Sequence, residues 1–153
     1  MDIHGVTVGV TLGDPLGVVA RAPIRGRVDG QIELGPRLMC PDGESCGFPG
    51  PLGTADALVH ARSDFHAPGN VDVHAGFGFG LGTVSQGCWY DAVREFCVEK
   101  TTFSALVRLP VGADVYFGRL AAGVQIVPAL RLTPDPFITF MGGLQVRVLV
   151  GNP

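Results

Sequence analysis

Residues 102–117 have the sequence TFSALVRLPVGADVYF, in which apolar and polar side chains alternate almost without a break. One parity of this stretch is entirely apolar and consists of Phe103, Ala105, Val107, Leu109, Val111, Ala113, Val115 and Phe117. The other parity contains Ser104, Arg108, Pro110, Gly112 and Asp114. A period of two predicts a β-strand that has one apolar face and one polar face.

The same pattern returns in residues 120–132 and 137–150, each time after a turn of only a few residues. In the last of these segments Val146 and Val148 lie on the apolar parity, whereas Arg147 lies on the polar one. Three strands that follow one another through short turns form a β-meander. The end of the chain therefore predicts antiparallel strands paired in sequence order.

Five segments upstream alternate in the same way: 6–13, 18–24, 27–34, 55–64 and 71–82. Two long connections, 36–53 and 83–100, separate these segments and contain the four cysteines of the chain. A length of 153 residues fits one domain, and neither a linker nor a longer internal repeat interrupts it. We therefore predict a single all-β domain over residues 1–153, with eight strands and two long loops.

The composition of this chain is more hydrophobic and less charged than that of a typical soluble domain. Hydrophobic residues make up 46% of it and charged residues only 16%, against about 25% charged residues in a typical soluble domain. No run of about 18 apolar residues is present, which excludes a transmembrane helix. A hydrophobic composition spread over alternate positions is typical of a transmembrane β-barrel. The net charge of −3 comes without a basic cluster, so we expect no nucleic-acid partner.

The polar parity carries a balanced set of charges and two histidines. Its members are Arg21, Arg27, Asp29, Glu33, Asp56, His60, Arg62, Asp64, Asp72, His74, Arg108, Asp114, Arg131 and Arg147. Such residues fit the lumen of a narrow barrel, where they pair with one another while the apolar face meets lipid. We therefore predict an eight-stranded antiparallel up-and-down transmembrane β-barrel whose lumen holds this charge network.

Two other interpretations of the pattern stay open at this point. A soluble, lipocalin-like, ligand-binding barrel has the same strands with the apolar face turned inward, and parity alone does not distinguish the two orientations. A narrow outer-membrane channel is the second alternative, with Arg62, Arg108 and Asp114 among the residues that line it. An eight-stranded barrel has a lumen about wide enough for side chains, which argues against a large open pore.

The two long loops are the predicted sites of interaction. With the N-terminus on the periplasmic side, both face outward, and the outward connections form an acidic rim with Asp14, Asp42, Glu44, Asp91, Glu95, Glu99 and Asp135. We expect this rim to serve a structural role or to bind an envelope protein. The adjacent aromatic pair Trp89 and Tyr90 predicts an anchor at the membrane interface; a ligand-binding tip is the alternative.

The cysteines fall into two pairs, Cys40/Cys46 and Cys88/Cys97, one in each long loop. Four cysteines allow three pairings, and we expect the local one, as two disulfides in an oxidising exterior. A metal site is the alternative, but the CxxC spacing typical of zinc ligands is missing. We therefore predict disulfide-braced loops without a metal or another cofactor.

Histidines near carboxylates raise the question of an enzyme. His60, His66 and His74 are interspersed with Asp56, Asp64 and Asp72. However, His60 and His74 belong to the charge-rich parity, and no serine occurs in a recognisable nucleophile context. Because a catalytic site is defined by roles rather than by residue counts, we interpret these residues as filling of the lumen and predict no enzymatic activity. An outer-membrane enzyme is the alternative, and it requires His60 or His74 to be exposed and paired with a nucleophile.

Three segments carry a resemblance to a known family. They are VGVTLGDPLG at residues 8–17, LPVGA at 109–113 and VPALRLTPD at 127–135. The first resembles the glycine-rich strand and acidic-Pro turn that open small bacterial outer-membrane β-barrel proteins of unknown function, and the others are similar to later strands. The resemblance implies eight strands in the lipid bilayer of the bacterial outer membrane, without a settled activity. Residues 1–4 lack the features of a signal peptide, so we expect the exported protein in a mature form.

Overall fold

The computed structural model describes residues 5–37, 50–63, 70–91, 96–133 and 136–150. Within these ranges only the backbone is described for residues 62–63, 70, 84–91 and 96–101. The strands are β1 (Val6–Asp14), β2 (Gly17–Arg25), β3 (Val28–Pro36), β4 (Pro51–Ser63), β5 (Asn70–Asp91), β6 (Phe96–Arg108), β7 (Val111–Phe117), β8 (Leu120–Thr133) and β9 (Phe137–Val150). Within these ranges, no helix has the length and apolarity needed to span a membrane.

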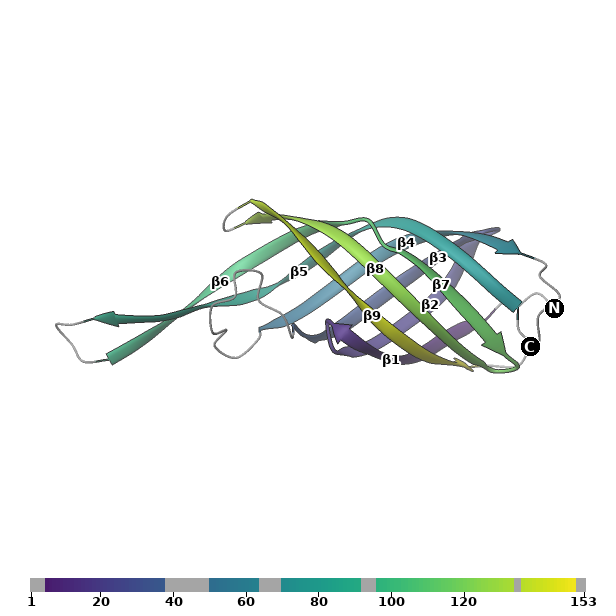
Figure 1. Cartoon of the computed structure of the whole chain (residues 1–153), viewed down its shortest axis with the longest axis horizontal. Coiled ribbons are helices and arrows are strands. Elements are labelled where there is room, and N and C mark those ends of the chain that lie inside the picture. Colours follow the sequence, from purple (N-terminus) through teal and green to yellow (C-terminus); the bar gives the residue numbers. More distant parts are fainter. Residues whose placement is uncertain (1–4, 38–49, 64–69, 92–95, 134–135, 151–153) are drawn as a thin grey trace.

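The strands form one closed antiparallel barrel. Neighbouring strands pair in sequence order, and β1 pairs with β9 over nine residue pairs, from Val6 opposite Val150 to Asp14 opposite Gly142. Figure 1 shows the tilted strands wrapping around the barrel axis, with both chain ends at the same end of the barrel. The structure confirms the prediction of an all-β, eight-stranded meander barrel.

The nine strands make eight barrel strands because β6 and β7 are two parts of one. Both pair with β5 on one side and with β8 on the other. The interruption falls at Leu109 and Pro110, since proline has no N–H for the ladder. Two hydrogen bonds carry the pairing across the gap: Gly76 N–H donates to the Pro110 carbonyl over 2.8 Å, and Leu109 N–H donates to the Pro128 carbonyl over 2.9 Å.

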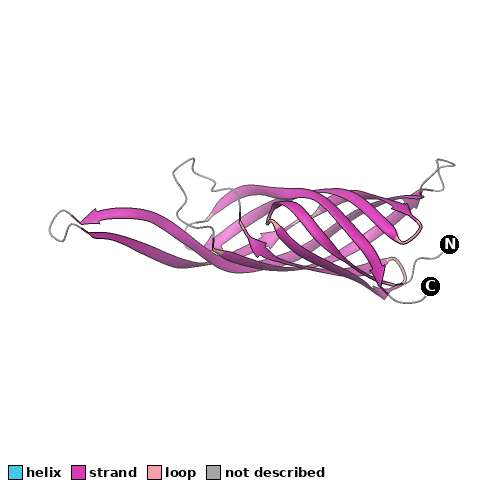
Figure 2. Cartoon of the chain, turned by 90° about the horizontal axis from the view of Figure 1, so that it is seen from below, coloured by secondary structure: helices cyan, strands magenta, loops and turns pink. Residues whose placement is uncertain are grey.

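A two-stranded ribbon extends the barrel at the end opposite the chain termini (Figures 1 and 2). The pairing of β5 with β4 stops at Gly82, and that of β6 with β8 starts at Ala105. The pairing between β5 and β6 nevertheless continues as far as Asp91 opposite Phe96. We call residues 83–91 and 96–104 the β-ribbon.

The β-ribbon corrects the prediction of a loop over residues 83–100. Most of this stretch is strand, because it is rich in β-branched and aromatic residues that favour cross-strand pairing, such as Val84, Trp89 and Val98. The other predicted loop, 36–53, is framed by paired residues of β3 and β4, Pro36 and Pro51. Residues 38–49 of that loop lie outside the described ranges.

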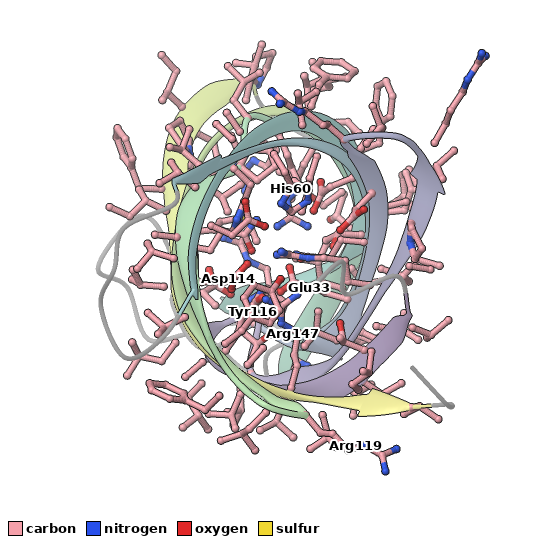
Figure 3. The ribbon with its side chains drawn as sticks, turned by 90° about the vertical axis from the view of Figure 1, so that its right-hand side faces the viewer. Glu33, His60, Asp114, Tyr116, Arg119 and Arg147 are labelled. Carbon is pink, nitrogen blue, oxygen red and sulfur yellow. The ribbon has the colours of Figure 1, made fainter. Side chains whose placement is uncertain are left out.

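The faces of the barrel are oriented opposite to those of a water-soluble domain. The apolar parity points outward, so that Ile138 is 71% exposed and Phe140 68% exposed. The polar parity points inward, and the side chains of Arg108 and Arg147 are fully buried. Figure 3 shows this division along the barrel axis, with apolar side chains around the wall and Glu33, Asp114 and Arg147 inside it.

Candidate functional site: the charged lumen

Asp114 on β7 is the centre of one cluster in the lumen. Its carboxylate accepts a hydrogen bond from Arg21 Nη1 over 2.6 Å and another from Arg147 Nη2. His74 Nδ1 lies 3.2 Å from the same carboxylate. Gly123, next to Asp114 on β8, makes room for this carboxylate, because a Cβ at that position would collide with it. Side chains from β2, β5 and β9 thus meet at one buried acid on β7.

Glu33 on β3 is the centre of a second cluster. One of its oxygens accepts hydrogen bonds from Thr11 Oγ1 over 3.0 Å and from Gln145 Nε2 over 2.8 Å. The other oxygen accepts a hydrogen bond from Arg108 Nη2 over 3.0 Å. Arg108 Nη1 also lies 3.4 Å from Asp56 Oδ2, so this arginine forms ion pairs with acids of two strands, β3 and β4.

A relay of side-chain amides joins the two clusters. Gln31 Oε1 accepts hydrogen bonds from Nε and Nη2 of Arg21, over 2.9 and 2.6 Å. Both Gln31 Nε2 and Gln145 Nε2 donate to Gln125 Oε1, over 3.0 and 2.8 Å. We did not predict these glutamines as part of the network. Their inward parity was visible in the sequence, but an uncharged amide carries no signal of ion pairing.

His60 lies in a third cluster, toward the end of the barrel with the chain termini. Its Nδ1 is 2.6 Å from Asp72 Oδ2, and its Nε2 is 3.0 Å from Asp29 Oδ2. Both nitrogens can donate to these acids only when the ring is an imidazolium. The His60 ring centroid is 5.5 Å from that of His74, which connects this cluster to Asp114.

Five buried apolar side chains pack together in the half of the lumen toward the β-ribbon. These side chains, which we call the apolar layer, are Leu52, Leu106, Val127, Ala129 and Met141, and none is more than 6% exposed. Leu52 is the second residue of β4, which starts at the ribbon end. This layer was not predicted, because the inward parity was interpreted as polar.

Two further pairs, both buried or partly buried, lie toward the ribbon end. Arg37 Nη2 donates to Asp14 Oδ2 over 3.0 Å. The Arg131 guanidinium carbon lies 3.8 Å from the centre of the Phe137 ring, within the range of a cation–π contact. Where the β-ribbon leaves the barrel, the outer wall has an open apolar groove of about 320 Å³, lined by residues that include Leu34, Gly53, Leu81 and Phe103.

The structure brings most of the predicted lumen residues together. It buries Arg21, Glu33, Asp56, His60, Asp72, His74, Arg108, Asp114, Arg131 and Arg147, and it leaves Asp29 with a side chain 24% exposed. Arg27 is the exception and is exposed. It follows Gly26, a turn residue with a φ of 57°, so the strand alternation does not extend to it. The side chain of Arg62 and the whole of Asp64 lie outside the description.

The predicted residues of the outer loops are described only in part. Cys40 and Cys46 lie outside the described ranges. Cys88, Trp89, Tyr90 and Cys97 have a described backbone, in which Tyr90 pairs with Cys97. The two disulfides and the aromatic anchor therefore stay predictions. Within the described ranges, no three His, Cys, Asp or Glu residues are grouped so that they could hold a metal ion.

Comparisons with known proteins add no family to these observations. No family model, no curated protein and no solved structure matches the chain.

Proposed function

We propose that this chain is a transmembrane β-barrel of the bacterial outer membrane that anchors the β-ribbon as an interaction element. The observation that supports this proposal is the division of side chains between the two faces of the wall. Large apolar side chains such as Phe79, Ile126 and Phe140 are more than half exposed on the outside. Monomeric soluble proteins rarely expose contiguous apolar patches of more than a few hundred Å². A lipid bilayer around the barrel would remove the free-energy cost of exposing these side chains to water.

The topology alone also fits a soluble, lipocalin-like barrel, but the two kinds of barrel differ in the side chains that fill the lumen. A soluble carrier of apolar ligands needs an apolar lumen and a polar outer wall. Here Arg108 and Arg147 are fully buried in the lumen, among acids and amides. Reversing the two faces would place these arginines outside, which the described geometry opposes. The side chains therefore favour the membrane over the soluble alternative.

The filled lumen favours an anchoring role over an open channel. Contacts such as Arg21–Asp114 and Arg108–Glu33 join residues of β2 with β7 and of β6 with β3, which are not neighbours in the barrel. Side chains from distant strands therefore meet across the lumen. An eight-stranded barrel offers little space beyond this. We accordingly propose a binding role rather than transport or catalysis.

The β-ribbon is the proposed point of interaction. In the described part of the chain, residues 83–91 pair only with β6, and residues 96–104 pair only with β5. Both outer edges of the ribbon thus present backbone N–H and C=O groups, which are a template for strand addition by an extended segment of another protein. We propose an envelope protein as that partner, in keeping with the acidic rim that the sequence predicts, although its member Asp14 is buried in an ion pair with Arg37.

The first test is gel mobility of the purified protein in detergent, with and without boiling. We expect a detergent requirement and a mobility shift on boiling, because a closed membrane barrel stays folded in the unboiled sample. A monomer that is soluble without detergent and shows no shift would contradict the membrane proposal and support the soluble barrel.

A second test concerns the β-ribbon alone. Thr83 and Phe103 face each other in the β5–β6 ladder, so an Asn-Gly turn placed between them would close a short hairpin and remove the ribbon. We expect this variant to keep its heat-dependent shift and to lose the crosslinks to an envelope protein that the intact chain forms from a position on the barrel, which both proteins share. Equal crosslinking by both proteins would contradict the role of the ribbon.

A further inference from the structure

We propose that the apolar layer, rather than the charge network, is the barrier that stops water and protons from crossing the barrel. This inference depends on the membrane function proposed above. It assigns different tasks to two parts of the lumen: the charge network fills a hydrated portion, and Leu52, Leu106, Val127, Ala129 and Met141 seal it toward the ribbon end.

The charge network has the chemistry of a hydrated space. Buried atoms such as Arg147 Nε, Arg108 Nε and Gln125 Nε2 have no hydrogen-bond partner among the described side chains. A buried polar group without a hydrogen bond costs several kcal/mol, and ordered water is the usual remedy inside proteins. The partly exposed Asp29, beside His60 at the terminal end, provides a polar entrance. We therefore infer that water reaches the clusters from this side.

None of the five side chains of the apolar layer has a strong hydrogen-bonding group, although Thr54, whose Oγ1 is buried without a hydrogen-bond partner, lies beside Gly80 as Leu106 does. Val127 and Met141 face each other on β8 and β9, and Leu52 and Leu106 come from β4 and β6. On the intervening β5, Gly80 has no side chain, and a Cβ there would lie only 3.2 Å from Leu106 Cδ1. Because Gly80 has no side chain, the Leu106 side chain can occupy the space beside it. Narrow apolar constrictions exclude water and ions by dewetting.

The remaining strands have glycines near the same end. β1, β2 and β3 contribute no side chain to the apolar layer, and each has a glycine on its inward parity close to the ribbon end: Gly13, Gly17 and Gly35. A Cβ at any of these glycines would collide with backbone atoms of the neighbouring strand. At these three positions the wall adds no side chain to the lumen, so we infer that the apolar layer closes it from the other strands.

The test uses vesicles that contain the protein and a pH-sensitive dye, with proton flux measured after an acid pulse. The double variant Leu106→Asn and Val127→Thr makes two near-isosteric polar changes in the apolar layer. The matched control is Leu58→Asn, which changes a fully buried inward leucine outside the layer. Arg147→Gln tests the charge network, since Asp114 keeps its ion pair with Arg21.

We expect vesicles with the natural protein, Leu58→Asn or Arg147→Gln to hold the pH gradient as protein-free vesicles do. The double variant should dissipate it roughly tenfold faster, equivalent to a barrier lower by about 1.4 kcal/mol. A leaky natural protein, a tight double variant, or a leak of the same size in Arg147→Gln would overturn the inference.

Insertion of each protein is checked by its heat-dependent gel shift and by protection from protease. If the double variant does not insert, the smaller change Val127→Thr takes its place, with the same expected direction. If the natural protein itself does not insert, the membrane proposal fails. If it inserts and the layer variants stay tight, only the assignment of the seal fails.

Discussion

The two faces of β9 differ in what they demand of a side chain. Toward the outside, Leu144, Val146 and Val148 are exposed without specific partners. Toward the lumen, Gln145 donates to both Glu33 and Gln125, and Arg147 forms an ion pair with Asp114. The outer face requires only an apolar group, whereas the inner face requires a particular group with its partner in place. Replacements on the two faces should therefore fail for different reasons.

The largest effect is expected inside, at Asp114. Asp114→Ala removes the shared acid of Arg21 and Arg147 and leaves two buried guanidinium groups without it. Breaking a buried pair in this way costs about 3–5 kcal/mol, which should appear in urea unfolding followed by far-UV circular dichroism in detergent or lipid. Asp114→Asn, which keeps a hydrogen-bond acceptor, is the control and should cost less. Equal stability of Asp114→Ala and the natural protein would contradict the importance of the cluster.

The next effect is expected outside and depends on depth. Val146 lies in the middle of the pairing of β9 with β1, whereas Val150 is the last residue of the strand. In a membrane, Val146→Arg should cost about 2–4 kcal/mol and Val150→Arg about 0–1 kcal/mol. Unfolding in lipid vesicles measures both. Equal and small costs would show that the outer wall faces water.

A smaller effect distinguishes two inward positions of β5 that lack side chains. Gly78→Ala would place a methyl group against the Asp56 carboxylate and the β4 backbone, and overpacking of this kind typically costs about 1–3 kcal/mol. At Gly80 the nearest atoms are side-chain carbons of Leu106 and Thr54, 3.2 and 3.4 Å from the new Cβ. Gly80→Ala should therefore cost less than Gly78→Ala in the same unfolding assay. The reverse order would contradict this account of the crowding around Asp56.

The smallest effect is expected at an arginine outside the network. Arg119 lies in the turn between β7 and β8, outside the barrel in Figure 3, and its Nη2 donates to the Leu149 carbonyl over 3.2 Å. Because this side chain is exposed, Arg119→Ala should cost at most about 1 kcal/mol. A cost that approaches that of Asp114→Ala would remove the distinction between exposed and lumenal charges.

Alternation in the sequence predicted the barrel, and it predicted the face on which residues such as Asp114 and Arg147 lie. It did not predict their partners, because Arg21 meets Asp114 only through the register of the strands and the closure of the sheet. Arg27 was misplaced because a turn ends the alternation at Gly26. The apolar layer could not be predicted from the alternation either. Leu106 points to the same side as Arg108, and an apolar residue at an inward position looks in the sequence like a break in the alternating pattern. The β-ribbon was missed because its cysteines and polar residues resembled those of a loop.

The seam between β1 and β9 has a consequence for how the protein is made. These are the first and last strands of the barrel, so the ring closes only through contacts that are very distant in sequence. Such contacts form slowly, because the chain between the two strands loses conformational entropy before the contacts contribute any stabilising free energy. Until the 14 residues of β9 are present, the other strands form an open sheet with unpaired edges at β1 and β8, prone to aggregate with other copies. A chain that ends before Phe137 should therefore produce aggregates rather than a smaller barrel.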